Sequence, residues 1–132
     1  MTTVGEVMTQ GVISIREEAS VEEAIKIMGE RHVSCLIVEK KDETDIDGIV
    51  TRKDIINKVV GIGRDIKKTK VSEIMSKPLM TVNPQMDVMC VARLMAQTNV
   101  RRFPVRQNDT IVGIISNSDI FRCYFIDKLC KK

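Results

Sequence analysis

The sequence has no tryptophan, a single histidine and no closely spaced pair of cysteines. A zinc site normally needs paired cysteine or histidine ligands, and a hydrolytic triad needs a histidine beside its nucleophile. His32, the single histidine, follows a predicted helix, where a positive charge interacts favourably with the helix dipole. We therefore predict no metal site and no enzymatic activity.

Aromatic residues and net charge are also scarce. The 132 residues include three phenylalanines and one tyrosine, and 21 lysines and arginines against 18 aspartates and glutamates leave a net charge of +3. Proteins that bind single-stranded nucleic acid normally combine stacking rings with a strongly basic surface. Neither feature favours a nucleic-acid partner. The short basic segments Arg52-Lys53 and Lys67-Lys68 keep a nucleic-acid-binding regulator as an alternative.

Long hydrophobic runs are absent as well. No apolar run approaches the roughly 20 residues that span a bilayer, and the first residues lack the basic and apolar regions of a signal peptide. These features predict a cytoplasmic protein without a membrane partner. In that compartment the four cysteines are expected to be free thiols. Cys123 and Cys130 are seven residues apart on a predicted helix, and a redox role for this pair stays open.

The most informative feature of the sequence is an internal repeat. Val4-Gly-Glu-Val-Met-Thr9 matches Val71-Ser-Glu-Ile-Met-Ser76 at an offset of 67 residues. Gly48-Ile-Val-Thr-Arg-Lys-Asp54 matches Gly113-Ile-Ile-Ser-Asn-Ser-Asp119 at an offset of 65 residues. Two copies of one unit therefore cover nearly the whole chain. We place the copies at residues 1–62 and 71–132, with a linker at 63–70.

Each copy is predicted to fold as β-α-β-β-α. Val21, Ala24, Ile25 and Met28 share one face of a helix, and Ser20 is its predicted N-cap. The other predicted elements are strands at 12–15, 34–38, 47–51, 102–105 and 111–116, and helices at about 52–61, from 88 onward and at 117–129. Each small sheet leaves an apolar face. The predicted fold class is therefore mixed α/β, with two pseudo-symmetric repeats packed sheet to sheet.

These motifs resemble a tandem pair of CBS domains, the cystathionine β-synthase domains that form a Bateman module. The resemblance rests on Val7-Met8-Thr9, on residues 33–38, on the segment from Gly48 to Asp54, and on their counterparts in the second copy. It covers essentially the full chain, which implies a stand-alone regulatory module rather than an enzyme. It further implies no cofactor, but an adenosyl ligand in the cleft between the repeats: AMP, ADP, ATP or S-adenosylmethionine. Ligand binding would shift conformational populations and signal to an effector protein.

Two sequences of the form Thr/Ser-x-x-Asp invite two interpretations. In Thr51-x-x-Asp54 and Ser116-x-x-Asp119 the hydroxyl and the carboxylate form a capping box at a helix start, and this alone explains the pattern. The same groups can hydrogen-bond a ribose diol beside a helix N-terminus that favours phosphate. The family resemblance implies that Asp54 and Asp119 contact ribose hydroxyls.

The two predicted half-sites differ in charge. Arg101 and Arg102 precede Phe103-Pro104, where the proline predicts a strand that lies at a sheet edge or is locally irregular, and their guanidinium groups suit a phosphate. The first copy has Ser34-Cys35 at the matching place. We therefore predict one dominant site per chain and a secondary half-site. By family resemblance, the dominant site contains Ile13, Val33, Ser34, Arg101, Arg102, Ile114, Ser116 and Asp119, and the secondary half-site contains Thr51 and Asp54.

The helices that follow Thr51 and Ser116 carry more apolar residues than one buried stripe requires. The surplus is drawn from Ile55, Ile56, Val59, Val60, Ile120, Phe121, Tyr124 and Phe125. An exposed apolar patch of this kind normally meets a partner, so we predict a two-fold homodimer packed through helices. A dimerisation or interaction module that binds no ligand is therefore an alternative function.

Overall fold

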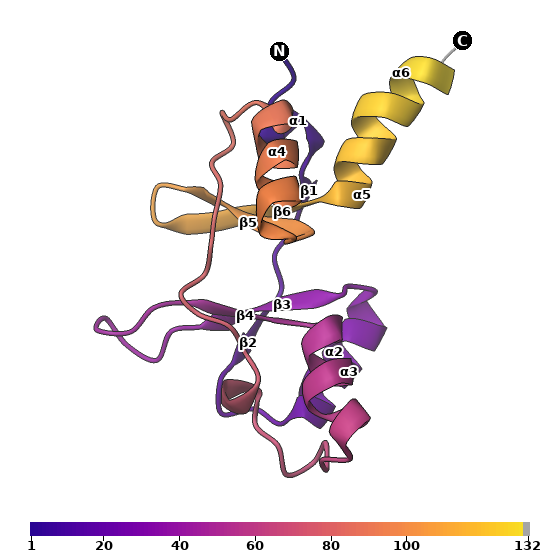
Figure 1. Cartoon of the computed structure of the whole chain (residues 1–132). Helices are drawn as coiled ribbons and strands as arrows, with labels where there is room; N and C mark the ends of the chain where they lie inside the picture. The colour runs from indigo at the N-terminus through magenta and orange to yellow at the C-terminus, as the bar shows by residue number, and fades with distance from the viewer. Residues whose placement is uncertain (131–132) are drawn as a thin grey trace. The chain divides into compact units, whose positions relative to one another are not determined.

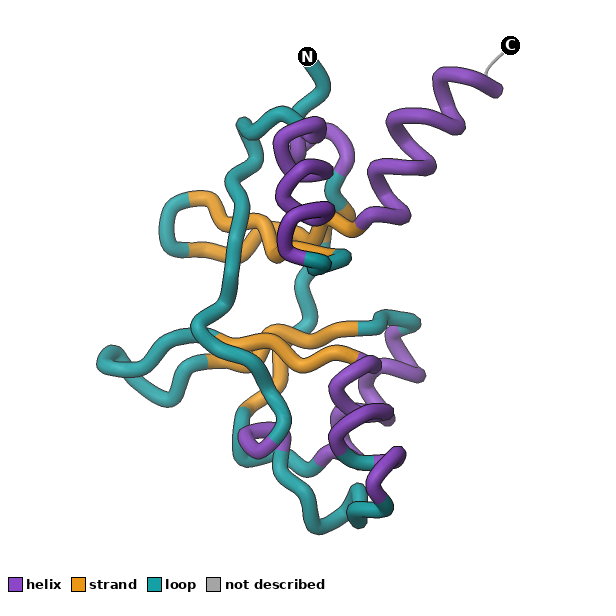
Figure 2. The backbone as a smooth tube through the Cα atoms, in the orientation of Figure 1, coloured by secondary structure: helices purple, strands orange, loops and turns teal. Residues whose placement is uncertain are grey.

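In a computed structural model, which describes residues 1–130, the chain forms two compact units (Figure 1). The first unit is Ile13–Leu79. The second consists of Met1–Val12 together with the chain from Met80 onward. Each unit contains one three-stranded sheet with helices (Figure 2). The predicted mixed α/β fold class is confirmed.

The first unit has the predicted β-α-β-β-α order. Its elements are β2 (Ser14–Arg16), α2 (Val21–Arg31), β3 (Cys35–Glu39), β4 (Gly48–Thr51), α3 (Arg52–Lys58) and the 3-10 turns η1 (Val60–Ile62) and η2 (Val71–Glu73). Strand β3 is central, parallel to β2 and antiparallel to β4. The Ser20 side chain accepts a hydrogen bond from the Glu23 N–H at 3.1 Å, so the predicted N-cap of α2 is confirmed.

The second unit has the same order of elements, except that its first strand is reduced to a single bridging residue, Val82. Its elements are α1 (Val4–Val7), β1 (Thr9–Gln10), α4 (Val88–Thr98), β5 (Arg102–Gln107), β6 (Thr110–Ser116), α5 (Asn117–Ile120), the π-helical η3 (Phe121–Ile126) and α6 (Asp127–Cys130). Strand β6 lies between β1 and β5 and is antiparallel to both. In place of a full first strand, Val82 alone makes a parallel bridge to Val105.

The first residues of each sequence repeat, here called its leading segment, pack in the compact unit formed by the rest of the other repeat. Thr9, at the start of the first repeat, pairs with Ile114 in the second unit. Ser76, at the start of the second repeat, pairs with Ile49 in the first unit. The Val4 N–H also donates to the Met86 carbonyl at 2.8 Å, which fixes α1 within the second unit. The sequence boundaries at 1–62 and 71–132 thus describe the repeat, whereas the compact units begin and end elsewhere.

The glycine that opens each repeated Gly-Ile motif lies where the backbone of an exchanged segment passes close beside a strand. A Cβ atom on Gly113 would lie 2.7 Å from the Thr9 carbonyl oxygen, and one on Gly48 would lie 2.8 Å from the Ser76 carbonyl oxygen. Because real Cβ atoms essentially never come this close to backbone, only glycine fits here without a shift of the exchanged segment. The glycine of each motif therefore leaves room for the exchanged segment beside it.

Each unit has its own hydrophobic core. In the first unit, residues of α2, β3, β4 and α3 pack with η2, and Leu36 is the largest fully buried side chain. In the second unit, residues of α1, α4, β5, β6 and α5 pack around Phe103, which is 1% exposed. Both amphipathic helices turn one face to a core, as their apolar periodicity predicts. Two cores of this kind explain why each unit is compact by itself.

Several local predictions differ from the structure. The strand predicted at 12–15 is β2, which spans Ser14–Arg16. Ile25, predicted to lie on the buried face of α2, is 38% exposed, so this buried face is narrower than predicted. The helix after Thr51 ends at Lys58, and the helix after Ser116 contains the π-helical turn η3. No helix within residues 1–130 is both long and apolar enough to cross a membrane.

Candidate functional site

The Asp119 carboxylate lies at the junction of β6 and α5 in the second unit. Asp119 Oδ2 accepts a hydrogen bond from the Ser116 N–H at 2.9 Å, and Ser116 Oγ accepts one from the Asp119 N–H at 3.1 Å. This reciprocal pair confirms the capping-box interpretation. The side chain of Asp119 is only 9% exposed, so its carboxylate is held in one orientation.

The other carboxylate oxygen of Asp119 has two further donors. Arg122 Nη2 donates to Oδ1 at 3.0 Å, and Thr9 Oγ1 donates to the same atom at 3.3 Å. Arg122 lies one helical turn beyond Asp119 and supplies the opposite charge that a buried carboxylate needs. Thr9 comes from β1, 110 residues away in the sequence.

Asp54 has the equivalent place in the first unit, with different partners. Its Oδ2 accepts hydrogen bonds from the N–H and the hydroxyl of Thr51, both at 2.9 Å. Its Oδ1 forms an ion pair with Lys58 Nζ at 3.2 Å, and Lys58 also donates to the Ile74 carbonyl at 3.0 Å. The capping box is therefore present in both units. Of the two capping-box carboxylates, Asp119 accepts a side-chain hydrogen bond from Thr9 of an exchanged segment, whereas the partners described for Asp54 are Thr51 and Lys58 of its own repeat.

The backbone of the two predicted arginines pairs with the start of the Ser116–Asp119 box at one end of the β5–β6 hairpin. Arg102 pairs with Ser116 in the strand register, and the Arg101 carbonyl accepts a hydrogen bond from the Asn117 N–H at 2.8 Å. Arg101 is exposed and Arg102 is half-buried. The prediction that β5 lies at a sheet edge is confirmed, and a register shift follows Pro104 between Val105 and Arg106.

The first unit repeats this backbone geometry without the arginines. Cys35 pairs with Thr51, and the Ser34 carbonyl accepts a hydrogen bond from the Arg52 N–H at 2.9 Å. Ser34 and Cys35 therefore stand where Arg101 and Arg102 stand in the second unit. Both half-sites offer a capping-box carboxylate, but only the second unit places two guanidinium groups at the start of the neighbouring strand.

The predicted site residues are divided between the two units. Ile114, on β6, lies with Arg101, Arg102, Ser116 and Asp119 in the second unit. Ile13, Val33 and Ser34 lie in the first unit, where all three are half-buried. Within that unit, the Ile13 carbonyl accepts a hydrogen bond from the Ile37 N–H at 3.0 Å. The assignment of these three residues to an adenine wall stays a prediction.

Three contacts of the capping-box carboxylates were missed by the sequence analysis. Arg122 follows Asp119 by three residues and Lys58 follows Asp54 by four. This is the spacing of ion pairs on a helix, so both contacts could have been predicted from the sequence. Thr9 gave no such signal, because its contact with Asp119 depends on the exchange of the leading segments.

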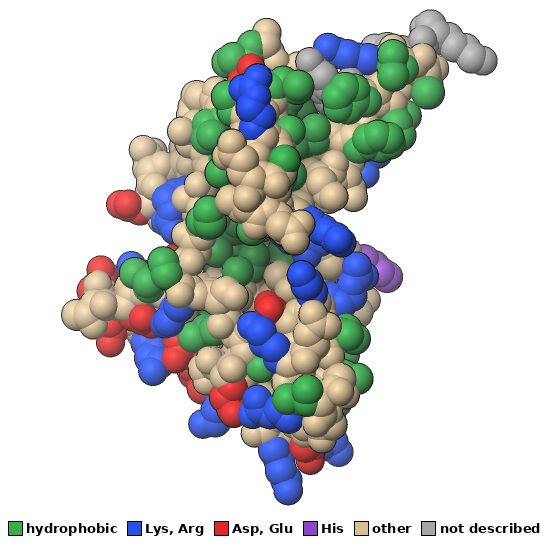
Figure 3. Space-filling model, in the orientation of Figure 1, with side chains coloured by type: hydrophobic (Ala, Val, Ile, Leu, Met, Phe, Trp, Pro, Cys, Tyr) green, Lys and Arg blue, Asp and Glu red, His purple; other side chains and the backbone are tan. Residues whose placement is uncertain are grey.

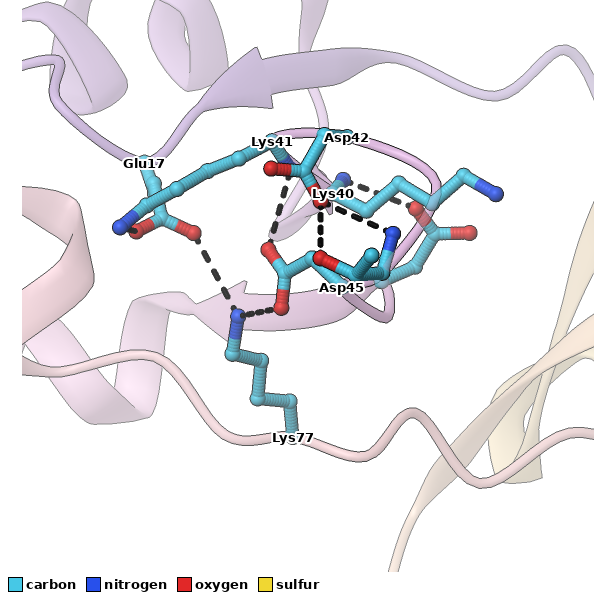
Figure 4. A network of polar contacts seen from close by, with 8 residues as sticks. Glu17, Lys40, Lys41, Asp42, Asp45 and Lys77 are labelled. Carbon is cyan, nitrogen blue, oxygen red and sulfur yellow. Dashed lines mark hydrogen bonds and ion pairs between the residues drawn. The ribbon is translucent and has the colours of Figure 1, made fainter.

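A second polar cluster lies in the first unit and is fully paired (Figure 4). The Glu17 side chain, 8% exposed, contacts Lys41 Nζ at 3.0 Å and Lys77 Nζ at 3.4 Å, and Lys77 also contacts Asp45 at 2.8 Å. The hydrogen bond from Lys77 holds the pKa of Asp45 well below its usual range, and the same bond raises the pKa of Lys77. These charges neutralise one another, so the cluster fastens the loop between β3 and β4 and offers no free charge to a ligand.

No other chemistry-bearing cluster stands out among residues 1–130. They include no group of three or more His, Cys, Asp or Glu side chains that could hold a metal ion. None of the four cysteines, all within residues 1–130, forms a disulfide; Cys123 is half-buried and Cys130 is exposed. His32 ends α2 in the left-handed conformation, with φ of 55°. The capping boxes and the arginines beside Ser116 are therefore the candidate site.

Comparison with known proteins gives one consistent family. The family model described as "CBS domain" matches residues 4–61 and again residues 71–125. The structure of a hexameric CBS-CP12 protein from bloom-forming cyanobacteria matches all of this chain and 76% of its own, with a TM-score of 0.91 and 46% identity. The CBS domain pair of protein MJ0100, in complex with 5′-methylthioadenosine and S-adenosyl-L-methionine, matches 94% of this chain and 96% of its own, with a TM-score of 0.79 and 27% identity.

Curated relatives place the same module in different contexts. The mitochondrial CBS domain-containing protein CBSX3 of Arabidopsis thaliana is 34% identical over 106 residues, which are 78% of this chain and 52% of that protein. A homoserine O-acetyltransferase of Methanococcoides burtonii is 33% identical over 122 residues, which are 92% of this chain and 24% of the enzyme. The chain thus spans about half of the first relative and a quarter of the second.

Proposed function

The chain belongs to the CBS domain family and carries two such domains in tandem; from this premise, we propose that it is a non-catalytic regulatory module that binds an adenosyl ligand. The observation that supports this most directly is the backbone pairing of Arg101 and Arg102 with the Ser116–Asp119 capping box at one end of the β5–β6 hairpin. The candidate ligands are AMP, ADP, ATP and S-adenosylmethionine. The proposal draws further support from MJ0100, a relative crystallised with two adenosyl compounds.

The chemistry of the second unit fits two parts of an adenosyl ligand, its ribose and its phosphate or carboxylate end. The buried carboxylate of Asp119 is an acceptor for ribose hydroxyls, which donate hydrogen bonds to carboxylate oxygens. Arginine suits the phosphate or carboxylate end, because its guanidinium donates two parallel hydrogen bonds to such groups. The same two features explain why one unit of this chain is proposed to bind more tightly than the other.

A thermal-shift panel tests the proposal. AMP, ADP, ATP, NAD, S-adenosylmethionine and guanine nucleotides are compared as ligands of the full chain. A ligand at about 100 times its dissociation constant is expected to add roughly 2.7 kcal/mol to the free energy of unfolding. We expect at least one adenosyl compound to raise the unfolding midpoint and the guanine nucleotides to leave it unchanged. A panel without any shift would favour the ligand-free interaction module, and salt-dependent binding of DNA or RNA would favour the nucleic-acid regulator.

The regulatory output is proposed to need an effector protein as partner. Ligand binding lowers the free energy only of the conformations that bind the ligand, and so shifts the population toward a form that the effector recognises. The similarity to a quarter of a homoserine O-acetyltransferase indicates that a similar module also occurs as one part of an enzyme. We assign no catalytic role to the residues of this chain.

We further propose that two copies of the chain associate through helices. Along the C-terminal helix, Phe121, Phe125, Ile126 and Leu129 are 62%, 40%, 41% and 82% exposed, and Figure 3 shows hydrophobic side chains gathered along it. Ile56 on α3 and Val60 in the 3-10 turn η1 that follows it are also more than half exposed. By contrast, Ile55, Val59 and Ile120 are buried in their own units. The Tyr124 side chain, part of the predicted surplus, lies outside the described residues.

The homodimer is testable by light scattering. At tens of micromolar protein we expect a species of twice the 14.9 kDa chain mass. Leu129→Glu is expected to shift this species toward the single-chain mass, because a charge replaces the most exposed apolar side chain of the helix. Ile46→Glu, a matched change at an exposed isoleucine of the β3–β4 loop, is expected to have no such effect. A 14.9 kDa species for the unmodified chain would contradict the proposal.

A further inference from the structure

The Asp119 carboxylate has little acceptor capacity left for a ligand. A carboxylate offers about four lone-pair positions for hydrogen-bond donors. Three donors already occupy it: the Ser116 N–H on Oδ2, and Arg122 Nη2 and Thr9 Oγ1 on Oδ1. A ribose diol that donates one hydroxyl to each carboxylate oxygen therefore needs one more position than remains. One of the present donors has to leave Oδ1.

The three donors differ in how firmly they are held. The Ser116 N–H belongs to the capping box at 2.9 Å, and Arg122 is a charged donor at 3.0 Å. Charge-assisted hydrogen bonds are roughly twice as strong as neutral ones. Thr9 is an exposed neutral hydroxyl at 3.3 Å, and its rotation needs no change in the β1 backbone, which is held by pairing with β6. Thr9 is therefore the donor that a ligand displaces most easily.

We infer that the Thr9 hydroxyl occupies the position of a ribose hydroxyl on Asp119 and competes with the adenosyl ligand for it. This inference rests on the proposed function and adds a regulator of the same site. Ligand binding releases Thr9 from Asp119, and Thr9 lies only four residues before Ile13, where the first unit begins.

The inference predicts that removing the hydroxyl tightens binding. Thr9→Val keeps the shape of the side chain and the β1 pairing, and it should lower the dissociation constants of AMP and S-adenosylmethionine about fivefold, the value of one typical net hydrogen bond. Thr9→Ser retains the hydroxyl and should bind like the wild-type protein. Ser76→Ala is the matched control, since Ser76 has the same place in the other unit and the described structure gives it no hydrogen bond to Asp54.

Calorimetry with AMP and its 2′-deoxy and 3′-deoxy forms separates competition from a general structural effect. The gain from Thr9→Val should disappear with the deoxy form that lacks the competing hydroxyl and persist with the other. Unchanged or weaker binding by Thr9→Val, while Asp119→Ala still weakens binding by tenfold or more, would overturn this inference and leave the proposed function intact. A wild-type protein that binds neither AMP nor S-adenosylmethionine would overturn the proposed function, and the inference with it.

Discussion

Asp119→Ala is expected to weaken the binding of the adenosyl ligand by tenfold or more, whereas Asp54→Ala is expected to change it far less. Both substitutions remove the carboxylate of a capping box, so their costs to folding are similar and Asp54→Ala is a matched control. Only the capping box of Asp119 pairs through its backbone with two consecutive arginines, Arg101 and Arg102. A hydrogen bond to a charged group contributes about 1.5–3 kcal/mol, and each 1.4 kcal/mol is about a tenfold change in affinity.

Arg101→Ala is expected to act in the same direction as Asp119→Ala. It removes a charged donor for the ligand's phosphate or carboxylate end without touching the capping box. Isothermal calorimetry measures both affinity and stoichiometry, and we expect one dominant site per chain. Two equal sites per chain, or an Asp119→Ala protein that binds like the wild type, would refute the assignment. The unfolding midpoint of each variant shows whether lost binding reflects lost folding.

Phe103→Ala is expected to lower the free energy of unfolding by about 3–5 kcal/mol. Phe103 is 1% exposed and is among the largest fully buried side chains of the chain. It lies on β5 opposite Ile115, and it packs among residues of α1, α4, β6 and α5. Its truncation therefore loses apolar burial and leaves a cavity that several elements have to close. A loss of this size is a large part of the 5–15 kcal/mol that stabilises a typical domain.

Chemical unfolding in urea measures the effect of Phe103→Ala. Phe121→Ala is the control, because it makes the same change at a phenylalanine that is 62% exposed. Below the concentration at which the chain associates, the control is expected to stay within about 0.5 kcal/mol of the wild type. Equal losses for the two variants would mean that Phe103 is not the centre of a packed core.

The local elements were accessible from the sequence because their signals lie within a few residues. Ser20 and the two Thr/Ser-x-x-Asp sequences predicted helix caps that the structure confirms. Pro104 predicted an edge strand, since a proline cannot donate to a central ladder. Exact element ends were less accessible: the first strand begins two residues later than predicted, and α3 stops at Lys58. Apolar periodicity marks where an element exists more sharply than where it ends.

The candidate site was accessible only in part. The internal repeat identified Asp54 and Asp119 as equivalent residues from the sequence. The strand register of the structure then placed Arg102 opposite Ser116. The donors on the carboxylates were not foreseen, although Lys58 and Arg122 have the spacing of helix ion pairs. The Glu17 cluster was equally hidden, since Lys41 and Lys77 reach Glu17 from distant parts of the chain.

The repeat, the mixed α/β class, the capping boxes and the two arginines of the second copy can all be read from the sequence. The exchange of the leading segments, which pairs Thr9 with Ile114 and Ser76 with Ile49, is seen only in the folded chain. The segments at Val4 and Val71 carry the same apolar pattern, and Gly48 and Gly113 leave the same room for a neighbouring backbone, so the local sequence does not distinguish which segment joins which unit. The contact between Thr9 and Asp119 follows from that exchange, and no local pattern in the chain encodes it.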